Sequence, residues 1–141
     1  MVIFVGLLDL FGKKDVGGEL TGRVPYALRL SLHPLRLTAN RSDSVRLTVR
    51  VENRTREPLL TSIVVQVPKQ LGLDQTCLSS VREIRLGELP AGEAKDVPVD
   101  VFGSTKTDSG EYNVIVTAIA HYRNYAQTLN SEKKAASIRV V

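Results

Sequence analysis

The sequence offers one thiol and two imidazoles for covalent or acid–base chemistry, namely Cys77, His33 and His121. A thiol beside an imidazole can act as a nucleophile with its base, and cysteine with histidine can bind a metal ion. The spacing supports neither use, because His33 directly precedes Pro34 and His121 follows a long apolar run far along the chain. We therefore predict a noncatalytic protein with no catalytic, cofactor-binding or metal-binding residues. The alternative is a small hydrolase that uses Cys77 as its nucleophile, which requires a reactive thiol.

The single cysteine also bears on the compartment in which the protein works. One cysteine cannot form an internal disulfide, and free thiols are typical of reducing compartments. The N-terminal stretch MVIFVGLLDLFGKK has its positive charges after the apolar residues, the reverse of the order in a secretory signal. Its apolar run is also far shorter than the ~20 residues of a membrane span. We expect a cytoplasmic protein without a disulfide.

Any candidate residue must be positioned by β-strands, because alternation with a period of two residues recurs along the chain. The clearest segment is 45–51, VRLTVRV, where aliphatic residues alternate with arginine and threonine, and it is followed by the turn-rich ENRTREP. Further strands are expected at 27–32, 61–67, 82–86, 97–101, 112–122 and 136–140. This pattern predicts an all-β domain of seven strands over residues 23–141. Residues 1–22 precede it as an apolar segment and a glycine-rich linker.

The stretch DSGEY lies directly before the most apolar strand. A D-x-G-x-Y stretch opens the sixth strand of immunoglobulin-like sandwiches, and the order of strands here resembles that fold. The resemblance implies a seven-stranded immunoglobulin-like β-sandwich with Greek-key topology. Tyr112 would form the tyrosine corner, in which the phenol hydroxyl bonds to backbone upstream, near Asp108. Gly110 would allow the close approach that a Cβ would obstruct.

The resemblance also implies which residues take the place of the missing disulfide. Val114 holds the position on the sixth strand, and Leu47 or Val49 holds the position on the second. Burying such a side chain contributes ~1.5 to 3 kcal/mol, which is comparable to ~2 to 4 kcal/mol for a disulfide. An aliphatic contact can therefore replace the bridge.

A finer resemblance covers roughly residues 26–141. The succession VRVENRTREP, a β-branched strand ending in VPKQLGL, REIRLGELPAGEAKDVPVDV and GEYNVIVTA is similar to the archaeal and bacterial cell-adhesion-related domain CARDB. The positions that match the family's pattern are Asn53, Pro68, Leu89, Ala91, Gly92, Glu93, Gly110 and Tyr112. Arg54-Thr55 stands where that family has a small glycine turn.

Arginines are concentrated in residues 23–56 of this chain of net charge +4, which raises the question of a nucleic-acid partner. In the immunoglobulin-like arrangement the strand with Arg46 and Arg50 would lie beside the strand with Asp96 and Asp100. We expect these charges to pair across the two strands and to cancel the basic field. Aromatic residues make up only 5% of the chain, which disfavours base stacking. We predict no nucleic-acid partner.

Two segments carry side chains suited to a protein partner. Phe4, Leu7, Leu8 and Phe11 have the spacing of one helix face and are followed by two lysines. The polar connection YRNYAQTLNSEKK between the last two strands contains the second set, Tyr122, Arg123 and Tyr125.

We predict a protein-interaction module that binds through a sheet edge, through this connection or through its apolar N-terminus. The partner is an unidentified protein or a second copy of the chain. The alternative is a peripheral membrane protein anchored by an N-terminal amphipathic helix.

Overall fold

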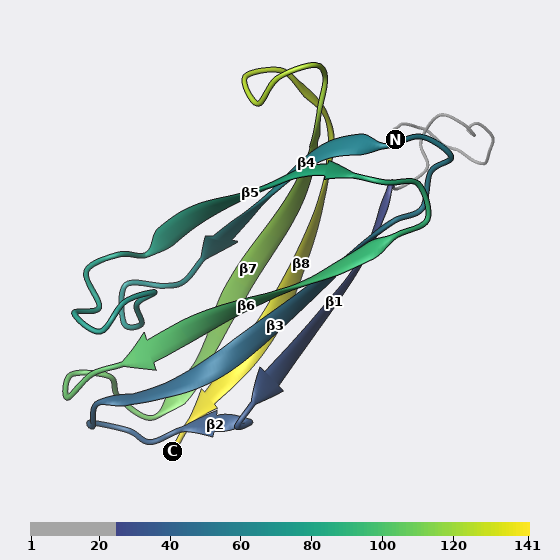
Figure 1. Ribbon diagram of the computed structural model, residues 1–141. Coiled ribbons are helices and arrows are strands. Elements are labelled where there is room, and N and C mark those ends of the chain that lie inside the picture. Colours follow the sequence, from purple (N-terminus) through teal and green to yellow (C-terminus); the bar gives the residue numbers. More distant parts are fainter. Residues whose placement is uncertain (1–24) are drawn as a thin grey trace, which may run out of the picture.

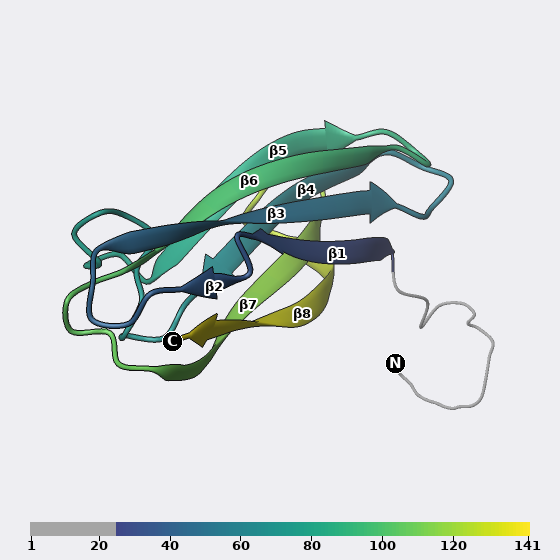
Figure 2. The same ribbon diagram turned by 90° about the horizontal axis from the view of Figure 1, so that it is seen from below.

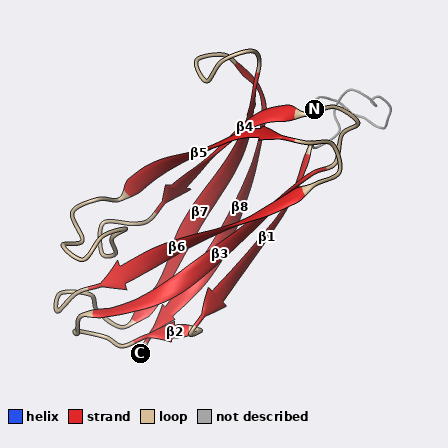
Figure 3. Ribbon diagram, viewed as in Figure 1, coloured by secondary structure: helices blue, strands red, loops and turns tan. Residues whose placement is uncertain are grey.

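Every regular element that the structure describes is a β-strand (Figure 3). The computed structural model describes residues 25–141, and its strands form two sheets packed face to face (Figures 1 and 2). The strands are β1 (Tyr26–His33), β2 (Arg36–Leu37), β3 (Asp43–Asn53), β4 (Leu59–Gln66), β5 (Val81–Leu89), β6 (Ala94–Gly103), β7 (Gly110–His121) and β8 (Thr128–Val140). One sheet has the order β1-β3-β6 and the other the order β2-β8-β7-β4-β5. The predicted all-β sandwich is confirmed.

The core between the sheets is aliphatic, as the alternation predicts. In β3 the side chains of Val45, Leu47, Val49 and Val51 are buried, whereas the arginines between them are exposed. The three residues expected in place of a disulfide all belong to this single core: Leu47, Val49 and Val114 each have 0% exposure. Burial of aliphatic area is thus the main stabilising contribution, since no disulfide is possible with one cysteine.

The described part of the chain has eight strands, so the prediction of seven is wrong. The additional strand is β2, which pairs in parallel with Arg139 and Val140 of β8. Leu37 is buried and Arg36 is exposed, but two residues are too few to show an alternation in the sequence. Pro34 follows the last residue of β1 and has no N–H to donate to a ladder, so the chain leaves one sheet there and joins the other.

The connection after β7 is also shorter than the sequence suggested. The segment that reads as one long polar loop, YRNYAQTLNSEKK, contains the first half of β8, which begins at Thr128. The polar composition is explained by exposure, because Leu129, Asn130, Ser131, Lys133 and Lys134 are exposed in that half. The β7–β8 loop proper comprises residues 122–127.

A tyrosine at the start of β7 ties this strand to the preceding turn. The Tyr112 hydroxyl donates a hydrogen bond to the carbonyl oxygen of Asp108 at 2.8 Å, which is the geometry of a tyrosine corner. Gly110 between them has φ +151°, a conformation that side-chain-bearing residues rarely adopt. A Cβ here would meet only the Tyr112 hydroxyl, 4.0 Å away, so the prediction that glycine allows a close approach is wrong and its role is conformational. The DSGEY stretch therefore forms a specific local structure rather than a generic turn.

Replacing Tyr112 with phenylalanine removes this hydrogen bond and keeps the ring. We expect the free energy of unfolding to fall by about 1 kcal/mol, the usual net contribution of one hydrogen bond. Urea denaturation followed by circular dichroism measures the change. The matched control is Tyr122→Phe at a tyrosine that is 46% exposed. Equal effects of the two substitutions would contradict the assignment.

Candidate functional site

The β7–β8 loop is fastened to the sandwich by Tyr125. Its ring meets the His121 ring edge-on, with the centroids 5.0 Å apart. The Arg85 guanidinium lies over the Tyr125 ring, 4.6 Å from its centre. The Tyr125 hydroxyl accepts a hydrogen bond from the backbone N–H of Gly87 at 3.0 Å. These contacts join the loop to β5 and to the end of β7, so Tyr125 acts within the protein as the anchor of the loop.

The other two predicted contact residues, Tyr122 and Arg123, are both exposed at the start of this loop, which projects beyond the sandwich (Figure 1). Tyr122 is 46% exposed, and the Arg123 guanidinium lies 4.8 Å from the centre of its ring. Arg123 has φ +68°, which is uncommon for a residue with a side chain. A hydrogen bond from the N–H of Tyr122 to the carbonyl of Gln127 at 2.8 Å closes the loop. The structure thus separates an anchor, Tyr125, from an exposed pair, Tyr122 and Arg123.

Beneath the anchor lies a polar pair that the sequence analysis missed. Ser62 of β4 and His121 of β7 are on neighbouring strands, and Ser62 Oγ lies 2.7 Å from His121 Nε2. Ser62 is fully buried, and His121 is 5% exposed. His121 Nδ1 is buried without a hydrogen-bond partner in the described residues. The one signal in the sequence was the pair of hydroxyl residues in the otherwise apolar strand of β4.

A serine beside an imidazole is the arrangement of an activated nucleophile, but this pair lacks the other parts of such a site. Ser62 has 0% exposure, so a substrate has no path to its hydroxyl. Within residues 25–141 no acidic group orients Nδ1, which catalytic histidines of this type require. The hydrogen bond instead satisfies two polar groups that would otherwise be buried alone below the loop.

Replacing Ser62 with alanine leaves both nitrogens of the His121 ring buried without a partner. We expect the free energy of unfolding to fall by about 2 kcal/mol, since an unsatisfied buried polar group costs ~1 to 3 kcal/mol. Thermal denaturation gives the change. The exposed Ser137, replaced in the same way, is the control and is expected to change stability by less than about 0.5 kcal/mol. An unchanged free energy of unfolding for Ser62→Ala would show that this hydrogen bond does not stabilise the fold.

The structure brings neither histidine to Cys77. The Cys77 sulfur lies 3.5 Å from the carbonyl oxygen of Phe102 on β6. His33 ends β1, which is two strands from β6, or ~10 Å at the usual strand spacing. His121 ends β7 at the other end of the sandwich (Figure 1). Burial raises the pKa of the Cys77 thiol, and the carboxylate of Asp74 raises it further.

This raised pKa predicts an unreactive thiol, the opposite of what the hydrolase alternative requires. At neutral pH the folded protein should react with iodoacetamide several-fold more slowly than the unfolded chain, because the thiolate is the nucleophile. The rate should keep rising with pH beyond the pKa of an ordinary thiol. Mass spectrometry of the alkylated protein across a pH series measures both. A folded-state rate above that of the unfolded chain would contradict this prediction.

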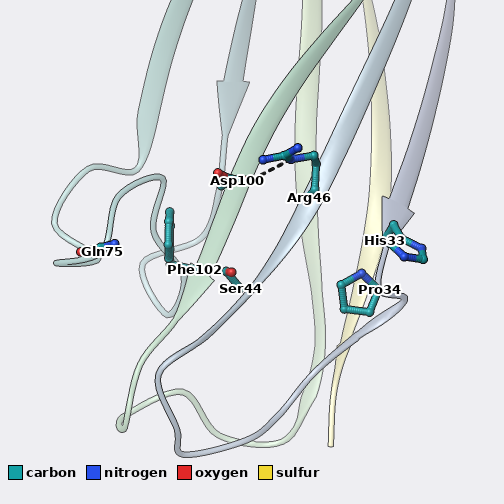
Figure 4. A pocket seen from close by; sticks show the side chains of 7 residues that line it. All are labelled: His33, Pro34, Ser44, Arg46, Gln75, Asp100 and Phe102. Atoms are coloured by element: carbon teal, nitrogen blue, oxygen red, sulfur yellow. Dashed lines mark hydrogen bonds and ion pairs between the residues drawn. The ribbon is translucent and has the colours of Figure 1, made fainter.

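A shallow, open hollow on the outer side of the three-stranded sheet is already occupied by paired charges (Figure 4). Its lining residues are His33, Pro34, Ser44, Arg46, Gln75, Asp100 and Phe102. Arg46 Nε lies 3.2 Å from Asp100, and the next such pair along these strands, Arg50 with Asp96, is at 3.1 Å. The predicted pairing of the arginines with the two aspartates is confirmed. These ion pairs neutralise Arg46 and Arg50, the two arginines that β3 presents on this side.

Within residues 25–141 no group of three or more histidine, cysteine or acidic side chains is arranged to hold a metal ion. The same range contains no helix that is long and apolar enough to cross a membrane. Phe4, Leu7, Leu8 and Phe11, which the sequence analysis singled out for partner or membrane binding, lie outside the described residues.

No protein-family model and no curated protein sequence matches the chain, but solved structures do. Escherichia coli α-2-macroglobulin, from domain MG7 to the C-terminus, matches with a TM-score of 0.58 and 20% identity, over 82% of this chain and 17% of that one. A FixG-related protein from Vibrio parahaemolyticus matches with a TM-score of 0.53 and 10% identity, over 84% of this chain and 98% of that one. The CARDB domain of a Pyrococcus furiosus protein, in complex with di-metal ions, matches with a TM-score of 0.50 and 16% identity, over 82% of this chain and 89% of that one.

These likenesses define the class of protein by its fold, which is an immunoglobulin-like β-sandwich. More particularly, the fold is similar to that of the Pyrococcus furiosus CARDB domain, so the resemblance inferred from the sequence is confirmed at the level of the fold. The chain spans only a small part of the α-2-macroglobulin structure. Enzymes are also among the similar structures, so the fold alone does not decide whether the chain is catalytic.

Proposed function

We propose that this protein is a noncatalytic protein-interaction module that binds its partner through the exposed residues Tyr122 and Arg123 at the start of the β7–β8 loop. The observation that carries the proposal is that one loop residue is packed against the sandwich while two others are exposed. Tyr125 is held by Arg85, His121 and Gly87, whereas Tyr122 and Arg123 face solvent. Tyrosine and arginine are enriched among the residues that contribute most to binding energy at protein interfaces.

The anchoring of the loop supports this proposal energetically. Association costs about 0.5 to 1.5 kcal/mol for each side chain that has to be ordered. The contacts of Tyr125 and the hydrogen bond between Tyr122 and Gln127 fix the loop before a partner arrives. The stacking of Arg123 on Tyr122 orders the contact residues themselves. A partner would therefore meet a surface that is largely preorganised.

Strands β5, β6 and β8 have features that disfavour binding by strand addition. β6, an edge of the three-stranded sheet, contains Pro98, which has no N–H to donate. β5, at the edge of the other sheet, has a register shift against β4 between Thr61 and Ser62. β8 carries charged residues, Glu132 to Lys134, along its first half. Charges, bulges and prolines are the features that prevent edge pairing, which favours the loop.

The remaining parts of this functional assignment are supported by composition and topology. We infer a cytoplasmic location, which the single unpaired cysteine supports. The absence of catalysis is supported by the raised pKa of Cys77 and by the full burial of Ser62. The crossing of the chain from β3 to β4 and its return from β5 to β6, beside β3, supports a Greek-key topology.

Photo-crosslinking in the source cells tests the loop. A benzophenone amino acid at position 122, which is aromatic like the tyrosine it replaces, is expected to capture one discrete protein. The control places the same group at Leu35, which is 73% exposed and distant from the loop. Adding Arg123→Ala should weaken capture from position 122 at least fivefold. Capture of the same proteins from both positions, or capture unaffected by Arg123→Ala, would overturn the proposal.

A further inference from the structure

The outer side of the five-stranded sheet carries four aliphatic side chains that the core does not use. They are Leu60 and Val64 of β4 and Ile115 and Ile119 of β7, here called the outer apolar face. Each alternates with buried core residues, so each points away from the other sheet. All four are half-buried, and none is among the side chains packed against the core. The register places Ile119 opposite Ser62 and Leu60 opposite His121, so the four lie on adjoining strands.

The corresponding side of the three-stranded sheet is quite different. There β3 presents Arg46, Thr48 and Arg50, and both arginines are paired with aspartates of β6. An antiparallel sheet with one side in water normally has polar residues on that side. In the five-stranded sheet the four aliphatic side chains instead alternate along their strands with Ser62 and Thr117, and a row of apolar side chains on a sheet face is typical of a surface that another element covers. The difference between the two sheets therefore indicates that the outer apolar face has an occupant.

The chain itself supplies a segment of suitable composition and reach. Twenty-four residues precede Pro25, and the most apolar of them come first. Pro25 lies beside the end of the sandwich where β4 begins, because its carbonyl accepts a hydrogen bond from the N–H of Arg54 at 2.9 Å. Residues 12–24, with four glycines, can span up to ~40 Å. That length is sufficient to reach any point of the outer apolar face.

The dimensions of the two surfaces also match. Phe4, Leu7, Leu8 and Phe11 have the spacing of one helix face, over which seven residues rise ~10 Å. Ile115 and Ile119, four residues apart in a strand, are separated by ~13 Å. A tether of this length holds the segment at millimolar effective concentration, which favours the chain's own segment over that of another molecule. We propose that residues 4–11 dock on the outer apolar face of the same chain.

Cysteine pairs that leave both surfaces intact test this proposal. In the full chain with Cys77→Ser, Gly12→Cys is combined either with Thr117→Cys, between Ile115 and Ile119, or with Thr48→Cys. Thr117 and Thr48 are both half-buried threonines on outer sheet faces, so the two pairs are matched. Docking predicts that the disulfide within one molecule forms at least about tenfold faster with Thr117→Cys. Adding Phe4→Ser and Leu7→Ser should reduce this ratio toward one.

Each other outcome overturns the proposal. Equal rates for the two pairs would show that the segment does not dock. Disulfides between two molecules, which depend on protein concentration, would assign the outer apolar face to a second copy of the chain. A high ratio that survives the two serine substitutions would show that the apolar residues are not what docks. None of these readouts depends on the partner of the β7–β8 loop, so the two proposals are tested independently.

Discussion

Replacing Asn53 with alanine is expected to lower the free energy of unfolding by about 3 kcal/mol. The Asn53 side chain is fully buried and makes four hydrogen bonds. Its amide NH₂ donates to the carbonyl oxygens of Glu57 at 2.8 Å and Leu89 at 2.9 Å. Its oxygen accepts from the N–H of Thr55 at 2.8 Å and from the hydroxyl of Thr55 at 2.7 Å. The amide thus joins the turn after β3 to the end of β5.

The cost is large because four hydrogen bonds of Asn53, one buried and three part-buried, are lost together. Each unsatisfied buried group costs ~1 to 3 kcal/mol, partly relieved where water can reach the turn. Urea denaturation measures the difference, with Asn113→Ala at an exposed asparagine of β7 as the control, expected within about 0.5 kcal/mol of the parent. A change below about 1 kcal/mol for Asn53→Ala would show that the network adds little.

Replacing Leu47 with alanine is the second substitution with a large expected effect. Leu47 is fully buried at the centre of β3, between β1 and β6. Removing three carbon atoms there loses the free energy of burial and leaves a cavity that the surrounding strands cannot fill completely. Leucine-to-alanine changes in cores cost ~2 to 5 kcal/mol, and we expect about 3 kcal/mol. No disulfide is present to limit the loss.

Leu35 provides a control with identical chemistry. It is 73% exposed in the turn between β1 and β2, so Leu35→Ala should change the free energy of unfolding by less than about 0.5 kcal/mol. Both variants are compared with the parent by urea denaturation, together with the dependence on denaturant concentration. Similar costs for the two leucines would contradict the view that burial in the aliphatic core replaces the disulfide of other immunoglobulin-like domains.

The side chains that face the core could be predicted, but the shortest and the most polar strands could not. Val45, Leu47, Val49 and Val51 follow a period of two, and the buried face fixes their register. β2 has two residues, one buried and one exposed, and is defined only by its pairing with β8. The first half of β8 was mistaken for a loop because it is exposed on both sides. Alternation of apolar and polar residues reflects burial of one side of a strand, so it does not indicate a strand whose two sides are both exposed.

The exposed charges were more predictable than the buried polar groups. Arg46 and Arg50 are four residues apart, as are Asp100 and Asp96, and antiparallel pairing brings both pairs into contact once the strands are neighbours. The Ser62–His121 pair has no such repeat. Its members are 59 positions apart, and only the packing of β4 against β7 makes them adjacent.

An aliphatic β-sandwich with a tyrosine corner and self-paired charges could be predicted from the residues alone. Those features depend on short-range spacing, because a strand repeats every two residues and the Tyr112 hydroxyl reaches a carbonyl only four residues back. Only the fold shows that Tyr125 is an anchor while Tyr122 is exposed, and that one sheet carries four aliphatic side chains on its outer side. These features depend on which distant strands become neighbours, and that choice is made by burial of the whole core.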